Sequence, residues 1–104
     1  MRNFSNELTD AQLERLAILS EEMGEAQQVI GKIIRHGYAS YNPMLEQPSR
    51  SNREELAREL GHVHFAIDTL VIFNDDVDSD KVSLSYVEKE KSIKQWLHYQ
   101  EPPR

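Results

Sequence analysis

Apolar residues recur at steps of three and four along most of this chain and predict three helices. The first helical stripe runs from Leu13 to Ile33, and Thr9 or Asp10 can cap its N-terminus. Gly37 follows a basic last turn and is predicted to end the helix. Two further glycines lie inside this stripe and indicate places where a neighbouring helix or a ligand approaches closely: Gly24 and Gly31.

The second predicted helix begins near Ser51 or Asn52, after a loop interrupted by prolines. Asn52 and Glu55 have the spacing of a capping box. The helix should end near Asn74, where a short acidic run begins a turn. Its apolar stripe consists of Leu56, Leu60, Val63, Ile67 and Leu70.

A third helix is predicted to start after Asp78 or Ser79 and to reach about Tyr99. Its stripe is weaker and consists of Val82, Tyr86, Ile93, Trp96 and Leu97, with core packing expected for Trp96. The chain shows no strand-like alternation and no internal repeat. The pattern therefore predicts an all-α fold, an antiparallel bundle of about three helices.

The length of 104 residues predicts a single helical domain that spans residues 1–104. A core of this size is marginal by itself, which favours a four-helix-bundle core completed by association of subunits. The chain contains no cysteine, so disulfide scaffolds, thiolate metal sites and cysteine nucleophiles are excluded.

The formal net charge of −6 argues against a nucleic-acid-binding surface, which needs a basic stripe to neutralise phosphates. No apolar run is long enough to predict a membrane-spanning segment. The N-terminal residues 1–10 are polar and do not resemble a signal peptide, so the expected location is the cytoplasm.

Two groups of acidic side chains border the apolar stripes of the first two predicted helices. Glu21 and Glu25 lie one above the other, and Glu22 borders the stripe of the first helix. Glu59 borders the stripe of the second helix, and His62 follows one turn later. Antiparallel packing would bring these groups face to face, where their repulsion requires cations. Such an oxygen-rich site suits Mg²⁺ or Mn²⁺, and the imidazole shifts the preference towards Mn²⁺.

Each acidic group by itself also fits an ordinary solvated helix face. The coincidence of two such groups, each beside an apolar stripe on a separate helix, favours a metal site. The basic residues Lys32, Arg35 and His36 fit ordinary charges at a helix C-terminus. However, Lys32 lies on the face of Glu21 and Glu25, about two turns further along, where it or Arg35 would reach a polyphosphate held by metal at the carboxylates. The predicted phosphate-binding residues are therefore Lys32, Arg35 and His36.

These motifs resemble the MazG-like all-α nucleoside triphosphate pyrophosphohydrolases, in particular the short, single-domain members of phages and bacteria. The family pattern consists of the acidic motifs EExxE and ExxD on consecutive helices. The resemblance covers about residues 9–75, and the matching segments are 19–25, 32–37, 52–56 and 59–63.

The resemblance implies hydrolysis of a (deoxy)nucleoside triphosphate to the monophosphate and pyrophosphate, by attack of water at the α-phosphate. It implies that Glu22, Glu25 and Glu59 are Mg²⁺ ligands. It also implies that Glu21 and Glu22 are catalytic residues, with Glu21 orienting the attacking water or supporting the ligands. The implied assembly is a homodimer or homotetramer.

One position departs from the family pattern, because His62 stands where the second motif has Asp. A neutral imidazole can coordinate a metal but contributes no charge. One interpretation is that His62 is a fourth metal ligand. The other is that this substitution has weakened catalysis, and that the protein is a helical module that binds nucleotides or only self-associates. His64 points to the opposite side of the helix and is not expected to replace the missing Asp.

A third alternative is a di-iron carboxylate bundle, because Glu59 and His62 form an ExxH motif. Such sites need a second ExxH motif, which this chain lacks and which only a symmetry-related copy would supply.

The candidates for stacking on the nucleotide base are Phe4, Tyr38, Tyr41 and Trp96. Lys89 and Lys91 are candidates for further phosphate contacts.

Overall fold

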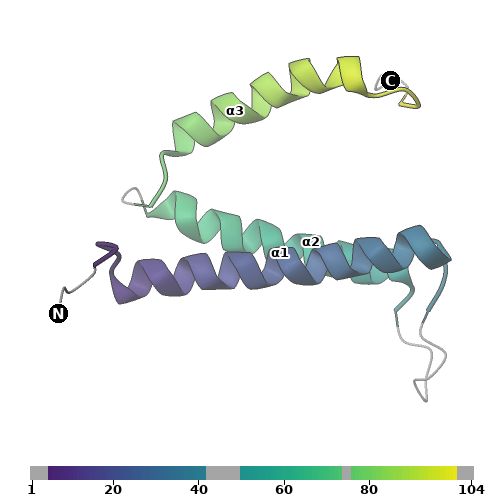
Figure 1. The fold of residues 1–104 in the computed structure, drawn as a ribbon, viewed down its shortest axis with the longest axis horizontal. Coiled ribbons are helices and arrows are strands. Elements are labelled where there is room, and N and C mark those ends of the chain that lie inside the picture. The colour runs from purple at the N-terminus through teal and green to yellow at the C-terminus, as the bar shows by residue number, and fades with distance from the viewer. Residues whose placement is uncertain (1–4, 42–49, 74–75, 101–104) are drawn as a thin grey trace. The chain divides into compact units, whose positions relative to one another are not determined.

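The computed structural model describes residues 5–41, 50–73 and 76–100 (Figure 1). Within these ranges the chain forms three α-helices and one short 3₁₀-helix and contains no strand, so the predicted all-α class is confirmed. The chain divides into two compact units, residues 1–70 and residues 71–104, which are described one after the other. The prediction of one domain over residues 1–104 stays a prediction. None of the helices in the described ranges has the length and apolar character needed to cross a membrane.

Helix α1 (Asp10–His36) begins at the predicted position. Thr9 is its N-cap and forms a capping box with Gln12. The Gln12 amide donates to Thr9 Oγ1 at 3.1 Å, and the Thr9 amide donates to Gln12 Oε1 at 2.9 Å. Two of the amides that a helix start leaves unpaired are satisfied in this way.

Gly37 ends α1, as predicted. Its φ of 89° and ψ of 168° lie in a region that essentially only glycine adopts. Its amide donates to the Ile33 carbonyl at 2.7 Å, which satisfies one of the last carbonyls of the helix.

Helix α2 (Asn52–Ile72) begins with a different capping box from the predicted one. Ser51 and Glu54 form it: the Glu54 amide donates to Ser51 Oγ, and the Ser51 amide donates to Glu54 Oε1, both at 3.3 Å. The predicted box of Asn52 and Glu55 is wrong, because the Ser-x-x-Glu spacing one residue earlier fits the helix start. The predicted end at Asn74 lies outside the described residues.

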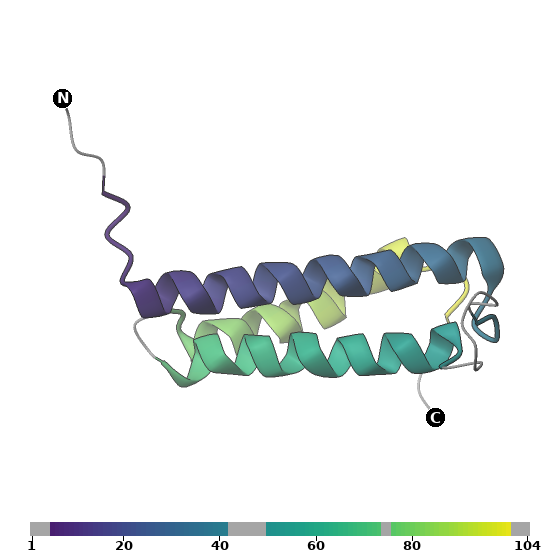
Figure 2. The same ribbon diagram turned by 90° about the horizontal axis from the view of Figure 1, so that it is seen from below.

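Asn52 connects the two helices. Its Nδ2 donates to the Gly37 carbonyl at 3.1 Å, and its amide donates to the Ser40 carbonyl at 2.7 Å. The Arg53 amide donates to the Tyr38 carbonyl at 2.9 Å. These bonds hold the C-terminus of α1 beside the N-terminus of α2, and the two helices lie side by side in antiparallel orientation (Figures 1 and 2).

The apolar core of this helical hairpin is small. Its buried hydrophobic residues are Ala26, Val29, Ala66 and Leu70. The predicted stripe of α2 is partly wrong, because Leu60 is 51% exposed and Ile67 is also exposed. Glu59 and Ala66 are buried instead, so the face of α2 that packs on α1 is rotated towards Glu59.

In the second unit, helix α3 (Ser79–Ser92) is capped by Asp78, whose carboxylate accepts hydrogen bonds from the amides of Asp80 and Lys81. A 3₁₀-helix, η1 (Ile93–Trp96), follows, so the regular helix ends earlier than the predicted Tyr99. No residue of α3 is buried. Trp96 is 71% exposed, and the prediction that it packs in a core is therefore wrong for this chain.

Candidate metal centre

The hairpin brings together four of the predicted site residues: Glu22, Glu25, Glu59 and His62. One ligand atom of each lies within 4.8 Å of the others. Glu22 and Glu25 stand on successive turns of α1, and Glu59 and His62 stand on successive turns of α2. A spacing of three residues keeps both members of each pair on one helix face, so antiparallel packing makes the two pairs converge.

The two carboxylates at the centre of this cluster each have a buried oxygen that forms no hydrogen bond with any described residue. The Glu59 side chain is only 7% exposed, and the Glu22 side chain is 22% exposed. Among the residues that the structure describes, no group forms a hydrogen bond with Glu22 Oε2 or Glu59 Oε2. A buried carboxylate oxygen without a hydrogen bond is costly, about 1–3 kcal/mol or more for a charged group. A cation between the two oxygens would remove this cost.

His62 faces both of these oxygens. Its Nδ1 lies 3.4 Å from Glu22 Oε2 and 3.5 Å from Glu59 Oε2. The imidazole can balance the carboxylates when it is protonated, or it can offer its lone pair to a metal when it is neutral.

The two carboxylate oxygens of Glu59 have different contacts, because Arg58 binds only one of them. Its Nη1 donates to Glu59 Oε1 at 3.1 Å, while Glu59 Oε2 faces the cluster. The same Nη1 lies 3.8 Å from Glu55 Oε2, and Arg50 Nη1 lies 3.2 Å from Glu55 Oε1. The contact between Arg58 and Glu59 orients the Glu59 carboxylate. Residues that form hydrogen bonds with metal ligands commonly orient those ligands in this way.

Arg58 was not predicted from the sequence. Residues that follow one another on a helix do not face each other, so its position next to Glu59 indicates no contact. The only available signal was that a cation directly precedes the second acidic motif.

The donor set of the cluster fits a divalent metal. Three carboxylates and one imidazole, with one ligand atom of each within 4.8 Å of the others, are typical ligands of Mg²⁺ or Mn²⁺. The burial of these oxygens, which form no hydrogen bond within the described residues, distinguishes this cluster from a solvated acidic face, whose carboxylates are hydrated.

The other predicted site residues are not part of this cluster. Glu21 is exposed on α1, on the turn before Glu25. The predicted phosphate-binding residues Lys32, Arg35 and His36 are exposed along the last turns of α1. Lys89 and Lys91 are exposed on α3, which belongs to the second unit.

The predicted base-stacking residues differ in their surroundings. Tyr38 is half-exposed, and the guanidinium carbon of Arg53 lies 5.0 Å from its ring centroid. Tyr41 is exposed to the same extent, and Phe4 lies outside the described residues. His64 is exposed, 3.8 Å from Asp68, and does not join the cluster, as expected.

Comparison of the chain with protein-family models, curated proteins and solved structures found no match. The resemblance to the MazG-like family therefore rests on the motifs of the sequence, and the case for a metal centre rests on the geometry of the hairpin.

Proposed function

We propose that this protein is a metal-dependent nucleotide pyrophosphohydrolase. The observation that carries the proposal is the convergence of Glu22 Oε2 and Glu59 Oε2, both buried and without hydrogen-bond partners in the described residues. Glu25 and His62 complete the donor set around them. Glu22, Glu25, Glu59 and His62 would hold Mg²⁺ or Mn²⁺.

The proposed reaction is hydrolysis of a (deoxy)nucleoside triphosphate. The oxygen of a water molecule bonds to the α-phosphorus, the bond from the α-phosphorus to the bridging oxygen breaks, and the monophosphate and pyrophosphate leave. The bound metal would neutralise the triphosphate and favour deprotonation of water. An acidic protein would bind a polyanion in this way without a basic surface.

Residues of the chain itself would position the substrate. Glu21 is exposed one turn before Glu25 and would orient the attacking water through its carboxylate. Lys32, Arg35 and His36 follow on the same helix and would bind the phosphate oxygens that extend beyond the metal. Lys89 on α3 is a further candidate for such a contact.

The experiment is a panel of ribo-, deoxyribo- and modified nucleoside triphosphates, incubated with the protein and Mg²⁺ or Mn²⁺. We expect pyrophosphate, not orthophosphate, to be released together with the monophosphate. The variants Glu22→Gln and Glu25→Gln should lose the activity, because each removes a charged ligand. Glu90→Gln changes an exposed carboxylate of α3 in the same way and should retain it.

Two results would contradict the proposal. The first is the absence of pyrophosphate release from every triphosphate with either metal. The second is equal activity of Glu22→Gln and Glu90→Gln. Iron in the purified protein, with no activity towards triphosphates, would instead support a di-iron site built on Glu59 and His62.

A second candidate function is a catalytically weakened module that binds nucleotides or only self-associates. The observation that favours it is His62, which replaces the Asp of the family motif and contacts both buried carboxylates. The variant His62→Asp distinguishes the two functions. A large gain in rate would support the weakened module, whereas a loss of rate would show that His62 serves the site.

A further inference from the structure

The metal cluster has two ends, and the hairpin differs in character between them. Antiparallel packing places the residues after Glu25 on α1 beside the residues before Glu59 on α2, at the end where the loop connects the helices (Figure 2). This end carries basic side chains, among them Lys32, Arg50 and Arg58. In the proposed reaction it receives the phosphates that extend beyond the metal.

The opposite end of the cluster adjoins exposed apolar side chains. Ile18 lies four residues before Glu22 and seven before Glu25, so it shares the face of α1 that carries both carboxylates. Phe65 lies three residues after His62, so it neighbours this imidazole on the surface of α2. Ile18 is 40% exposed and Phe65 is 68% exposed. Because the two helices are antiparallel, both side chains lie beyond the cluster at the same end, about one turn from a proposed ligand.

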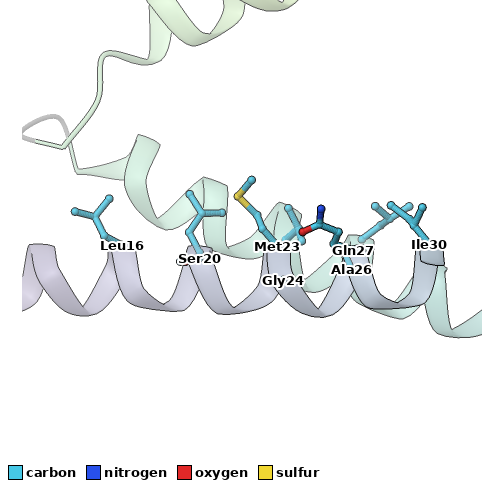
Figure 3. A pocket seen from close by; sticks show the side chains of 10 residues that line it. Leu16, Ser20, Met23, Gly24, Ala26, Gln27 and Ile30 are labelled. Atoms are coloured by element: carbon cyan, nitrogen blue, oxygen red, sulfur yellow. The ribbon is translucent and has the colours of Figure 1, made fainter. Parts of the chain in front are cut away.

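Packing within the hairpin does not account for the position of Phe65. The hydrophobic residues buried in the hairpin are others, namely Ala26, Val29, Ala66 and Leu70. Phe65 is also not among the residues that line the apolar groove formed by α1 and α2, which include Leu16, Met23 and Ile30 (Figure 3). Within the described hairpin Phe65 serves neither the core nor the groove, and its ring is available to a ligand.

We propose that Ile18 and Phe65 form a platform for the base of the nucleotide, with the ring of Phe65 stacked on the face of the base. This placement rests on the proposed hydrolase function and specifies how the substrate lies. With the α-phosphate at the metal, the outer phosphates point towards Lys32, and the nucleoside points the opposite way, towards Phe65. A helix rises about 1.5 Å per residue, so Ile18 lies about 6 Å along α1 from Glu22. The sugar that separates the α-phosphate from the base has about this length.

The direction of the substrate distinguishes Phe65 from two of the aromatic residues predicted to stack on the base. Tyr38 and Tyr41 follow the C-terminus of α1, at the end that receives the phosphates, and a base on the platform would not reach them. Phe65 was not predicted because it lies outside the apolar stripe of α2 and outside the acidic motif. The available signal was an aromatic residue one helical turn after His62.

The platform would recognise the face of a base and not its edge. The residues that form and flank it, 17–19 on α1 and 65–67 on α2, are all apolar, so their side chains offer no hydrogen bond to a base. Stacking tolerates every base, because each base has a face, and we expect KM values for the four common bases within about ten-fold of one another. A preference of more than about 100-fold for one base would show recognition of its edge and would contradict this expectation.

Tryptophan fluorescence provides a direct test of stacking. In Phe65→Trp the platform carries an indole, whose fluorescence a stacked base should quench. The ligand is a deoxynucleoside triphosphate with a methylene group between the α- and β-phosphorus, which prevents cleavage there, added together with Mn²⁺. We expect this analogue to quench Phe65→Trp more than the unmodified chain, whose single tryptophan is Trp96. Inorganic triphosphate has no base and should cause no additional quenching.

Steady-state kinetics test the same contact without a new fluorophore. Phe65→Ala should raise the KM for a nucleoside triphosphate about ten-fold or more and leave kcat nearly unchanged, because stacking contributes equally before and during the reaction. The inhibition constant of inorganic triphosphate should not change. Leu60→Ala is the matched control, since it shortens a half-exposed apolar side chain of the same helix that lines the groove. Equal KM values for Phe65→Ala and Leu60→Ala would overturn the platform.

The platform and the hydrolase activity fail in different ways. Pyrophosphate release without additional quenching in Phe65→Trp would overturn the platform and leave the hydrolase function intact. Additional quenching without pyrophosphate release would overturn the hydrolase function and leave the platform as a nucleotide-binding surface. Titration calorimetry that detects no binding of the analogue in the presence of Mn²⁺ would overturn both.

Discussion

The two oxygens of Glu59 have different surroundings, and only one of them faces the proposed metal site. Oε1 is paired with Arg58, and Oε2 is buried without a hydrogen bond from any described residue. In an isolated hairpin such an oxygen is destabilising, because the carboxylate loses its hydration without compensation. Arrangements that reduce stability in this way are typical of functional sites.

Arg58 is predicted to orient Glu59 without touching the metal. We expect Arg58→Ala to weaken Mn²⁺ binding about 10- to 100-fold, because groups that orient metal ligands have effects of this size. Titration calorimetry with Mn²⁺ alone would measure the loss. Arg50→Ala is the control, because Arg50 pairs with Glu55 and, among the described residues, not with Glu59. If the two variants bind Mn²⁺ equally well, the orienting role is wrong.

At the scale of the elements, the connection between α1 and α2 is determined by backbone geometry and by one amide side chain. Gly37 adopts a positive φ, and its carbonyl accepts a hydrogen bond from Asn52. The Asn52 side chain is buried in this contact. The direction in which α2 leaves the loop, and thus the pairing of the two acidic motifs, depends on these residues.

Gly37→Ala is expected to destabilise the hairpin by about 1–3 kcal/mol, because the backbone conformation at residue 37 is strained for any residue with a side chain. Denaturant unfolding followed by helical circular dichroism would measure the change. Gly61→Ala should have the opposite sign and stabilise the chain by about 1 kcal/mol, since Gly61 lies within a helix and has open space around it. An unchanged free energy of unfolding in Gly37→Ala would contradict the predicted backbone strain at residue 37.

At the scale of the whole molecule, the small core implies that ligands contribute strongly to stability. Four hydrophobic residues are buried among the described ones, and many large apolar side chains are exposed. A ligand that binds only the folded chain stabilises it in proportion to the logarithm of its concentration. A metal ion bound at the proposed centre would therefore stabilise the protein.

Mn²⁺ is expected to raise the unfolding free energy by about 2.7 kcal/mol at a concentration one hundred times its dissociation constant. The increase follows from binding between α1 and α2, and a chelator should reverse it. Thermal unfolding with and without Mn²⁺ would measure it. Glu25→Gln should abolish the increase and Glu90→Gln should retain it, and an equal increase in both variants would exclude the proposed cluster.

The sequence by itself determined where the three helices begin and the spacing of the residues within each acidic motif. Thr9 and Gly37 set the ends of α1 through local hydrogen bonds and backbone conformation, which depend on neighbouring residues only. The three-residue spacing within each motif placed Glu22 with Glu25 and Glu59 with His62, because helix periodicity is the same in every protein.

The tertiary structure decided which face of each helix is buried. Helix α2 has apolar residues around a wide arc, so periodicity permitted Leu60 and Ile67 in the core, whereas packing on α1 buried Glu59 and Ala66. The contact of Arg58 with Glu59 also depends on side chains placed by this packing, and so does the burial of two carboxylate oxygens that form no hydrogen bond within the described residues. Such features arise from contacts between residues far apart in the chain, which a local pattern does not contain.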